Sequence, residues 1–256
     1  MGSARAIGID IGGSGIKGAL VDVNAGELIG ERLRVPTPQP ARPGDVVAAA
    51  VGLVEELGPG LPVGIGVPGV VLGGTMMSAA HLDPAWIGLD ARAAFAGALG
   101  RDCAVLNDAD AAGLAEMRFG AAAGHPGVVL VLTLGTGIGS ALFAGGRLVP
   151  NTEFGHIEIR GKDGELRASA GARERRGLSY RAWAPLLNEY LNRVDALLWP
   201  ELIILGGGIS RKADRFLPLL DVRPPVVPAA LRNQAGIIGA AVRGHQLAAA
   251  AERGAA

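Results

Sequence analysis

The stretch IGIDIGGSGIKGALVDV, residues 7–23, decides how the rest of this chain is interpreted. Its glycines Gly13, Gly15 and Gly18 have the GxGxxG spacing of a dinucleotide-binding loop. That loop binds pyrophosphate only where the glycines join a strand to a helix. The residues on both sides of this turn are apolar and β-branched, and those after Gly18 show no helical period. The stretch therefore predicts a hairpin of two strands with the glycines in its turn.

Length, composition and charge limit the possible classes of protein. The 256 residues are enough for one large domain or two lobes, and 49% of them are hydrophobic, so a substantial core is expected. The 24 basic and 24 acidic side chains cancel, and we expect neither nucleic acid nor a membrane as a partner. Cys103 is the single cysteine, which excludes an internal disulfide framework. Because no signal-peptide pattern or long apolar run is found, we expect a cytoplasmic protein.

The rest of the first half alternates between strands and helices. Residues 27–35 follow the hairpin as a third strand, and the proline-rich segment 36–44 connects it to a helix. That helix is expected over residues 45–57, with Asp45 as its N-cap. The further expected elements are a strand over 62–69, a helix near 90–99, a strand at 103–108 and a helix over 109–118. This order predicts an α/β fold.

The second half of the chain begins like the first. Residues 127–149 again predict strand, turn, strand, turn and strand, and Gly135-Thr136-Gly137 takes the place of Gly13-Ser14-Gly15. Internal repetition of this kind predicts a duplicated unit. Glycine turns let backbone N–H groups approach phosphate closely, so two facing hairpins are suited to hold one phosphate chain. The glycines of LGGGIS, 205–210, follow a later strand and suit the same kind of ligand.

Several polar side chains follow predicted strands, and the residues alone leave their roles open. Asp10 ends a buried strand, where its carboxylate needs either a positive group or the N–H groups of its own turn. Lys17 is either a solvated strand residue or a countercharge for phosphate. At Asn107-Asp108, a catalytic role competes with simple capping of the next helix by Asp108 or Asp110.

The segment EFGHIE, 153–158, and the basic stretch after it carry further candidates. Glu153 and His156 are either a metal-binding pair or a surface coincidence. Arginine forks bind phosphate oxygens well, so the basic stretch is either a track for a phosphate chain or a solvated charged face. Its members are Arg160, Lys162, Arg167, Arg173, Arg175, Arg176 and Arg181, and Arg211, Lys212 and Arg215 would extend it.

These motifs together resemble a known family of enzymes. The glycine loops resemble those of actin-like sugar kinases, through DIGGSGIKG at 10–18, LGTGIGSAL at 134–142 and LGGGIS at 205–210. The chain more closely resembles the ROK family of repressors, open-reading-frame proteins and kinases, through GVPG at 66–69, ND at 107–108 and EFGH at 153–156. Within that family, the segments 82–88, 161–180 and 198–218 are similar to those of polyphosphate glucokinases.

The resemblance implies a fold and a reaction. The expected fold is the duplicated actin-like ATPase fold, which is α/β and ribonuclease H-like, with two lobes around a cleft. The N-terminal lobe would span 1–108 and be joined by the C-terminal helix 236–256, and the C-terminal lobe would span 109–235. The implied reaction is phosphorylation of glucose to glucose 6-phosphate from inorganic polyphosphate, ATP or both, with Mg²⁺ and in a homodimer. A strictly ATP-dependent ROK glucokinase or a related hexose kinase is the alternative.

The resemblance also assigns roles to individual residues. Asp108 would accept the proton of the attacking sugar hydroxyl, and Asp10 would lie near the metal and the transferred phosphate. The implied sugar-binding residues are Asn107, Glu153, His156, Gly69, Glu165 and His81. The implied phosphate-binding residues are Asp10, Gly12, Gly13, Ser14, Gly15, Lys17, Gly135, Thr136, Gly137, Gly207 and Gly208. An actin-like ATPase or chaperone would share both hairpins but would not need the sugar-binding set.

The chain departs from the family pattern in the sugar-binding set. Most ROK proteins carry a cysteine-rich zinc knot soon after the motif histidine, whereas residues 157–180 contain no cysteine, so no zinc is expected. The missing knot leaves open which group orients His156. Glu165 is our choice for the third acidic sugar ligand. His81 stands where many relatives have an asparagine, and it is either a hydrogen-bond donor to the sugar or a plain loop histidine.

Overall fold

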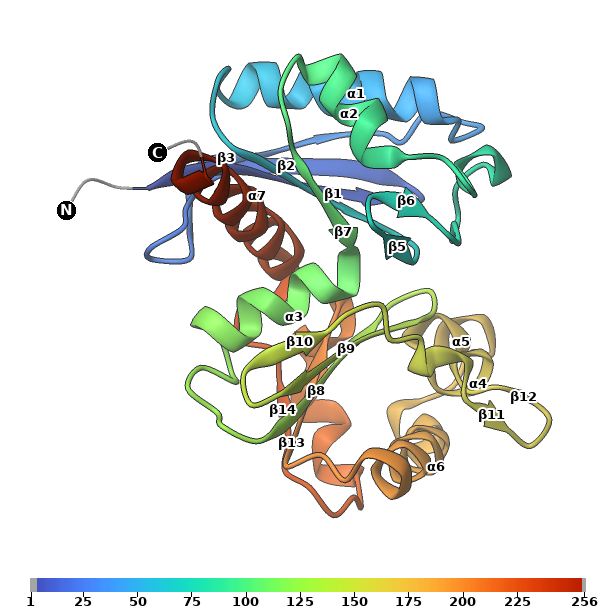
Figure 1. The fold of residues 1–256 in the computed structure, drawn as a ribbon. Coiled ribbons are helices and arrows are strands. Elements are labelled where there is room, and N and C mark those ends of the chain that lie inside the picture. Colours follow the sequence, from blue (N-terminus) through green and yellow to red (C-terminus); the bar gives the residue numbers. More distant parts are fainter. Residues whose placement is uncertain (1–3, 255–256) are drawn as a thin grey trace. The chain divides into compact units, whose positions relative to one another are not determined.

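The chain divides into two compact units that share one kind of architecture. The computed structural model describes residues 4–254. Unit 1 consists of Met1–Ala115 with Gln234–Ala256, and unit 2 of Glu116–Asn233. The units divide within helix α3 (Asp108–Phe119), whose first residue is where we predicted the boundary between lobes. Each unit is built on its own five-stranded sheet (Figure 1).

The sheet of unit 1 starts with the predicted hairpin. Its strands are β1 (Arg5–Gly12), β2 (Gly15–Asp22), β3 (Glu27–Val35), β4 (Val63–Val67) and β7 (Ala104–Asn107), in the order β3-β2-β1-β4-β7. β1 pairs antiparallel with β2, so that Asp10 lies opposite Lys17 and Gly12 opposite Gly15. β4 runs parallel to both β1 and β7. The hairpin prediction is confirmed, and the dinucleotide-binding turn is excluded because no helix follows Gly18 directly.

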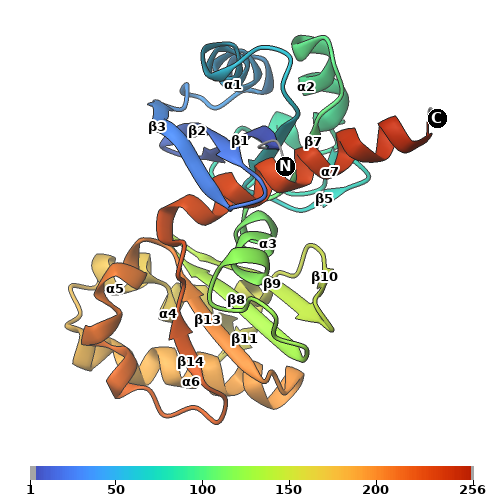
Figure 2. The same ribbon diagram turned by 90° about the vertical axis from the view of Figure 1, so that its left-hand side faces the viewer.

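Helices cover both faces of this sheet. They are α1 (Pro43–Leu57), α2 (Ala91–Leu99) and α7 (Ala235–Gly254). Unit 1 also contains the short 3-10 helix Pro84–Trp86 and a small hairpin of β5 (Val71–Leu72) and β6 (Thr75–Met76). α1 and α2 lie on one face and α7 on the other (Figures 1 and 2). The predicted N-cap of α1 is wrong: the helix begins at Pro43, and Asp45 lies in its first turn. Pro43 has the fixed φ that suits a first helical position, and Asp45 interacts favourably with the helix dipole.

Unit 2 repeats the topology of unit 1. Its strands are β8 (Val128–Leu134), β9 (Ile138–Ala144), β10 (Arg147–Val149), β13 (Leu202–Gly206) and β14 (Val226–Pro228), in the order β10-β9-β8-β13-β14. β8 pairs antiparallel with β9 and parallel with β13, as β1 does with β2 and β4. The matching strand order confirms the duplication predicted from the two glycine turns.

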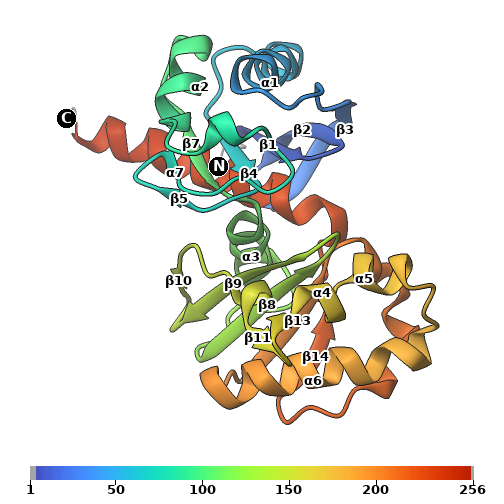
Figure 3. The ribbon, with the colours of Figure 1, turned by 90° about the vertical axis from the view of Figure 1, so that its right-hand side faces the viewer.

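The remaining elements of unit 2 pack around this second sheet (Figure 3). They are β11 (Glu158–Ile159), β12 (Lys162–Asp163), α4 (Glu165–Ala168), α5 (Ala170–Arg175), α6 (Tyr180–Leu198) and the 3-10 helices Phe154–His156, Gly208–Arg215, Leu217–Leu219 and Arg232–Gln234. α6 buries Trp183, Leu187 and Tyr190 against the sheet core. In residues 4–254, no helix combines the length and the apolar character needed to cross a membrane.

A buried carboxylate fastens two loops of unit 2 to α3. Glu116 is 1% exposed. Its Oε2 accepts hydrogen bonds from the N–H groups of Ala121 at 2.8 Å and Ala230 at 3.1 Å. Its Oε1 accepts one from the N–H of Leu231 at 2.8 Å. Without this side chain, these backbone donors would lose their partner inside the protein.

Replacing this carboxylate is expected to destabilise the protein. We expect Glu116→Ala to lower the free energy of unfolding by about 3 kcal/mol, because buried donors left unsatisfied each cost roughly 1–3 kcal/mol. Chemical denaturation monitored by circular dichroism measures the change. Glu55→Ala, which removes an exposed glutamate from α1, is the matched control and should change the free energy by less than about 0.5 kcal/mol. Equal stability of the two variants would contradict the role of Glu116.

Candidate functional site

The first glycine hairpin carries an ion pair across its two strands. Asp10 Oδ2 accepts from Lys17 Nζ at 3.0 Å, with the side chains 20% and 33% exposed. Antiparallel pairing places the two residues directly opposite each other. Of the alternatives left open by the sequence, the structure favours a positive partner for Asp10. The pair is accessible enough that an incoming anion or cation can compete for either member.

The turn of this hairpin is held from behind by the segment that follows β3. Thr37 Oγ1 donates to the carbonyl of Gly12, and Gln39 Nε2 donates to the carbonyl of Gly13 at 3.1 Å. A side chain at Gly13 would place its Cβ 2.7 Å from the Cβ of His81. His81 therefore lies against this turn. With its carbonyls tied down, the turn keeps a defined shape.

Asn107 is the residue that caps α3. Its side chain is buried, and its Oδ1 accepts from the N–H groups of Ala109 at 2.9 Å and Asp110 at 3.0 Å. Capping by Asp108 or Asp110 was the alternative from sequence, and the structure places this role mainly on Asn107. Asp108, partly exposed at the first residue of the helix, accepts from the N–H of Ala109 through Oδ1 at 2.8 Å.

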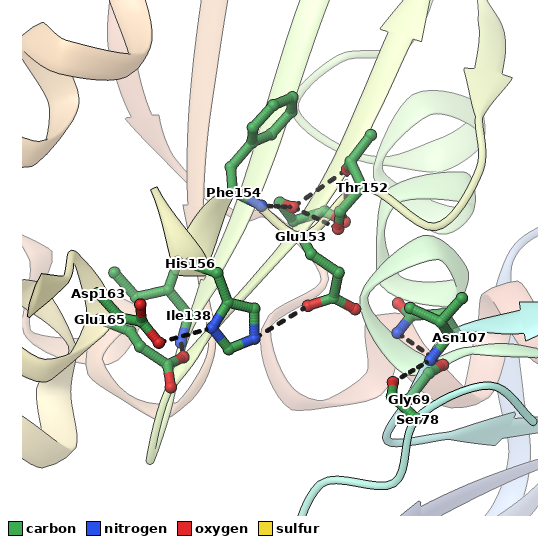
Figure 4. Close-up of polar contacts among 12 residues, drawn as sticks. Gly69, Ser78, Asn107, Ile138, Thr152, Glu153, Phe154, His156, Asp163 and Glu165 are labelled. Carbon is green, nitrogen blue, oxygen red and sulfur yellow. Dashed lines mark hydrogen bonds and ion pairs between the residues drawn. The ribbon is translucent and has the colours of Figure 1, made fainter. Parts of the chain in front are cut away.

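Asn107 also connects α3 to the loop after β4. Its Nδ2 donates to the carbonyl of Gly69 at 3.1 Å (Figure 4). The same loop is fastened by Ser78, whose Oγ accepts from the N–H of Val70 at 3.0 Å. A Cβ at Gly69 would overlap the carbonyl oxygen of Ser78. The strand end with Asp108 and the GVPG loop thus form one fixed assembly within unit 1.

In unit 2, His156 is surrounded by acidic side chains. Its Nδ1 lies 2.9 Å from Oδ2 of Asp163, and its Nε2 lies 3.8 Å from Oε2 of Glu153 (Figure 4). The hydrogen bond to Asp163 raises the pKa of His156, and the charges of Glu165, Asp163 and Glu153 add to this effect against the opposing effect of burial. Burial raises the pKa of Glu153, which the charge of His156 partly offsets. Glu153 and His156 are therefore a coupled pair.

Glu165 supports the second glycine hairpin. Its Oε2 accepts from the N–H of Ile138, the first residue of β9, at 2.9 Å. A Cβ at Gly137 would overlap this carboxylate, so any larger residue there would require the Glu165 side chain to move. Ser140 is tied in a similar way to the segment before His156, since its Oγ accepts from the N–H of Phe154 at 3.0 Å. These contacts join the hairpin turn to the acidic cluster inside unit 2.

A cavity of about 360 Å³ opens beside the second hairpin. It brings together the turn after β8 and the loop after β13, and it adds α5 and the start of α6. Gly207, with φ of 81°, makes the loop fit because its backbone passes close to Leu134. The polar or glycine residues of its wall are Gly135, Thr136, Gly171, Arg173, Glu174, Tyr180, Gly208 and Lys212. Two cations thus face two of the predicted phosphate loops.

The basic stretch does not form one continuous track. Arg160 and Arg167 both pair with Glu189 on α6, so part of the positive charge of the stretch is already paired within the chain. Arg173 lies in the cavity wall with its guanidinium carbon 4.5 Å from the centre of the Tyr180 ring. Its Nη1 donates to the carbonyl of Leu178 at 2.8 Å, whereas its buried Nε has no hydrogen-bond partner. Arg173 is the member of the stretch that lines the cavity, and its Nη2 also lies 3.8 Å from Oε1 of Glu174.

Comparison with known proteins identifies the family. The ROK family profile matches residues 6–174, and the chain belongs to this family. A polyphosphate glucokinase of Mycobacterium tuberculosis (strain CDC 1551 / Oshkosh) is 51% identical over 92% of this chain and 89% of that protein. The crystal structure of an inorganic polyphosphate/ATP-glucomannokinase from Arthrobacter sp. strain KM is 54% identical, with a TM-score of 0.92 over 95% of this chain and 99% of that one. A ROK glucokinase from Streptomyces griseus, crystallised with glucose and AMPPNP, is 26% identical, with a TM-score of 0.79 over 93% of this chain and 98% of that one.

The solved relatives also settle the fold class. The ROK sugar kinases have the actin-like ATPase fold, and the duplicated five-stranded sheets of this chain follow it. Asp163 is the residue in the acidic cluster that the sequence analysis did not assign. Its Oδ2 lies 2.9 Å from Nδ1 of His156, so it contacts the imidazole in a chain that has no zinc knot to do so.

Proposed function

We propose that this protein phosphorylates glucose to glucose 6-phosphate, using inorganic polyphosphate and also ATP as phosphoryl donors. The likeness to the Arthrobacter polyphosphate/ATP-glucomannokinase, 54% identical with a TM-score of 0.92, is the observation that carries the proposal. The M. tuberculosis relative supports the same sugar and the same donor. The motifs that carry the resemblance, GVPG at 66–69, ND at 107–108 and EFGH at 153–156, are present in the chain.

The reaction we propose begins at Asp108. Its carboxylate accepts the proton of the sugar 6-hydroxyl as the hydroxyl oxygen attacks the terminal phosphorus of the donor. The bond from that phosphorus to the bridging oxygen then breaks, and the leaving group is polyphosphate shortened by one phosphate, or ADP. A carboxylate is a sufficient base here, because the transition state of phosphoryl transfer is loose and depends mainly on positioning and charge neutralisation.

Glucose would be held by the polar groups around the two motif segments. In this proposal Glu153 and His156 hydrogen-bond sugar hydroxyls, because a buried hydroxyl without a partner is costly. Asn107 Nδ2 uses one of its two N–H donors on Gly69, and the second is assigned to the sugar. Glu165 and His81 complete the proposed sugar-binding set. Each contacts one of the glycine hairpins: Glu165 accepts from the N–H of Ile138, and His81 lies against Gly13.

The donor would be held by the two glycine hairpins, the loop after β13 and the cavity with Arg173 and Lys212. Asp10 fits Mg²⁺, because Mg²⁺ typically takes one or two protein carboxylates and otherwise substrate phosphates. In residues 4–254, no group of three His, Cys, Asp or Glu side chains is arranged to hold a metal. Water and substrate phosphate would supply the other ligands, as is usual for Mg²⁺. When bound, the ion neutralises charge on the phosphates. Lys17, at 3.0 Å from Asp10, would turn to the donor phosphate.

Initial rates of the purified protein test the proposal. Glucose and Mg²⁺ are supplied with nucleotide-free polyphosphate or with ATP as the sole donor, and glucose 6-phosphate is measured; mannose is tested in parallel. Turnover with both donors is the expected result. Turnover with ATP but not with polyphosphate would mean that ATP is the donor and that the polyphosphate part of the proposal is wrong. No turnover of any hexose with either donor would overturn the proposal. The mass of the protein in solution checks the proposed homodimer.

Removing the cation of the cavity wall should impair use of polyphosphate. We expect Arg173→Gln to lower kcat/KM for polyphosphate by roughly tenfold or more, since a hydrogen bond to a charged group contributes about 1.5–3 kcal/mol. ATP should be affected less, because it presents fewer phosphates to the cavity. Arg176→Gln, an exposed arginine of the same stretch, is the matched control and should leave both values unchanged. An equal effect of both substitutions on polyphosphate use would contradict the assignment.

A further inference from the structure

We propose that Asp163 is a positioning residue that fixes the orientation and protonation of His156, so that Nε2 of His156 is presented to the sugar. The inference rests on the proposed function for its last step. Its earlier steps concern only the contacts of unit 2. Asp163 does not touch the substrate in this scheme, and it acts through the imidazole ring.

The two ring nitrogens of His156 have different partners. The contact from Nδ1 to Asp163 Oδ2, at 2.9 Å, is a hydrogen bond, whereas the 3.8 Å from Nε2 to Glu153 Oε2 is too long for one. An ionised carboxylate can only accept, so Nδ1 must carry the proton that it donates to Asp163. In the neutral ring, Nε2 is then the acceptor, free to bind a hydroxyl. The Asp163 contact therefore selects the tautomer.

The hairpin β11–β12 gives Asp163 a defined position. Its turn residues Arg160 and Gly161 have φ of 53° and 74°, the left-handed region that two-residue hairpin turns need. Arg160 Nε donates to Glu189 on α6, and Arg167 Nη2 donates to the other oxygen of Glu189 at 3.1 Å. On the far side of Asp163, the N–H of Gly164 donates to the carbonyl of Ile157 at 2.8 Å. These contacts hold the hairpin backbone that carries Asp163, and a fixed backbone is what a group needs in order to orient another.

The charges around His156 all have one sign. Asp163 faces Nδ1, Glu153 faces Nε2, and Glu165 adds its charge from the start of α4. The bond to Asp163 is the largest cause of the raised pKa of His156, and burial opposes it. Because this pKa is above the ordinary value, the imidazolium stabilises the folded protein at acidic pH, and the contribution is lost as the pH rises through the folded pKa.

The first test is nuclear magnetic resonance of the full chain labelled with ¹⁵N and ¹³C at histidine. His156→Gln identifies the resonance of His156 among the four histidines. In the unaltered protein we expect the raised pKa and the Nδ1–H tautomer. In Asp163→Ala both should be lost, with the pKa moving down and Nδ1 deprotonated in the neutral ring. Glu158→Ala is the matched control, because Glu158 is exposed and lies directly opposite Asp163 on the same hairpin.

The second test asks whether this orientation serves sugar binding. Asp163→Ala should raise KM for glucose on the order of tenfold, by analogy with the loss seen when the carboxylate that orients a metal-binding histidine is removed. KM for polyphosphate should stay unchanged, and Asp163→Glu should restore part of the loss. An unaltered pKa and tautomer in Asp163→Ala would overturn the proposal. A changed tautomer in Asp163→Ala with a normal KM for glucose would overturn the sugar-binding step of the proposal. If the unaltered protein does not phosphorylate glucose, the proposed function is overturned, and the magnetic resonance experiment still decides whether Asp163 sets the tautomer of His156.

Discussion

Asp108→Asn is expected to abolish nearly all turnover while leaving the protein folded. Removal of a general base typically costs roughly 10²–10⁴ in rate, and we expect a loss of kcat in that range. The substitution keeps the shape of the side chain and an Oδ1 that can accept from the N–H of Ala109, now at 2.8 Å from Asp108. Initial rates at saturating glucose and polyphosphate measure the loss, and thermal unfolding checks that stability is retained.

Asp90→Asn is the matched control for this prediction. Asp90 precedes α2 in the same unit and caps it by accepting from the N–H of Ala93 at 2.8 Å. Asparagine and aspartate cap helices about equally well, so this variant removes a carboxylate from a helix start without a loss of stability. Its kcat should equal that of the unaltered protein. If Asp108→Asn kept more than about a tenth of the unaltered rate, the base would have to be another group.

The duplicated fold is predictable because its strongest signals are local. Each glycine turn joins strands that are neighbours in sequence, and the pairs Asp10 with Lys17 and Thr133 with Gly139 follow from that adjacency. Repetition of the same pattern in the second half then predicts the second sheet. The N-cap of α1 was less predictable, since Asp45 is a good capping residue but Pro43 already starts the helix.

The contacts of the candidate site are harder to predict, because they depend on elements too short to show a pattern and on partners outside the local motif. The hairpin β11–β12 brings Asp163 to His156, and each of its strands has only two residues. Strands this short show no alternation of apolar and polar residues from which they could be predicted. Its turn has Arg160-Gly161 instead of the common Asn-Gly, and this hides the hairpin signal. Glu189, which pairs with Arg160, lies outside the basic stretch. Counting charges within 160–181 therefore overstated the positive charge available to a ligand.

Helix α7 shows the same dependence on distant partners, since it returns from the end of the chain to the first sheet. It lies on β1 and β4 with backbone against backbone (Figure 2). A Cβ at Gly8 would overlap the carbonyl oxygen of Ile237, and one at Gly239 would overlap that of Ala111. Glycines on both sides are thus the reason that the helix packs so closely. Packing of this helix against the first unit is predictable only from the family resemblance.

Gly64→Ala should be the most destabilising single substitution that we predict. A Cβ at Gly64 would overlap the carbonyl oxygen of Ala240 and lie 3.0 Å from the backbone nitrogen of Gly244. Neither atom can move without shifting α7 as a whole, which would open the core along β1 and β4. We expect a loss of at least about 4 kcal/mol, a large share of the roughly 5–15 kcal/mol that stabilises a typical protein. Chemical denaturation or loss of soluble expression measures it.

Gly52→Ala distinguishes this packing effect from a general cost of replacing glycine. Gly52 lies inside α1, and a Cβ there would meet nothing within 4 Å. Alanine should therefore raise the free energy of unfolding by about 0.5–1 kcal/mol, because glycine loses more backbone entropy in a helix. Opposite signs for the two substitutions would establish that close approach of α7 is what requires glycine at position 64. A loss below about 1 kcal/mol in Gly64→Ala would mean that the helix can shift cheaply, and would contradict the role assigned to this contact.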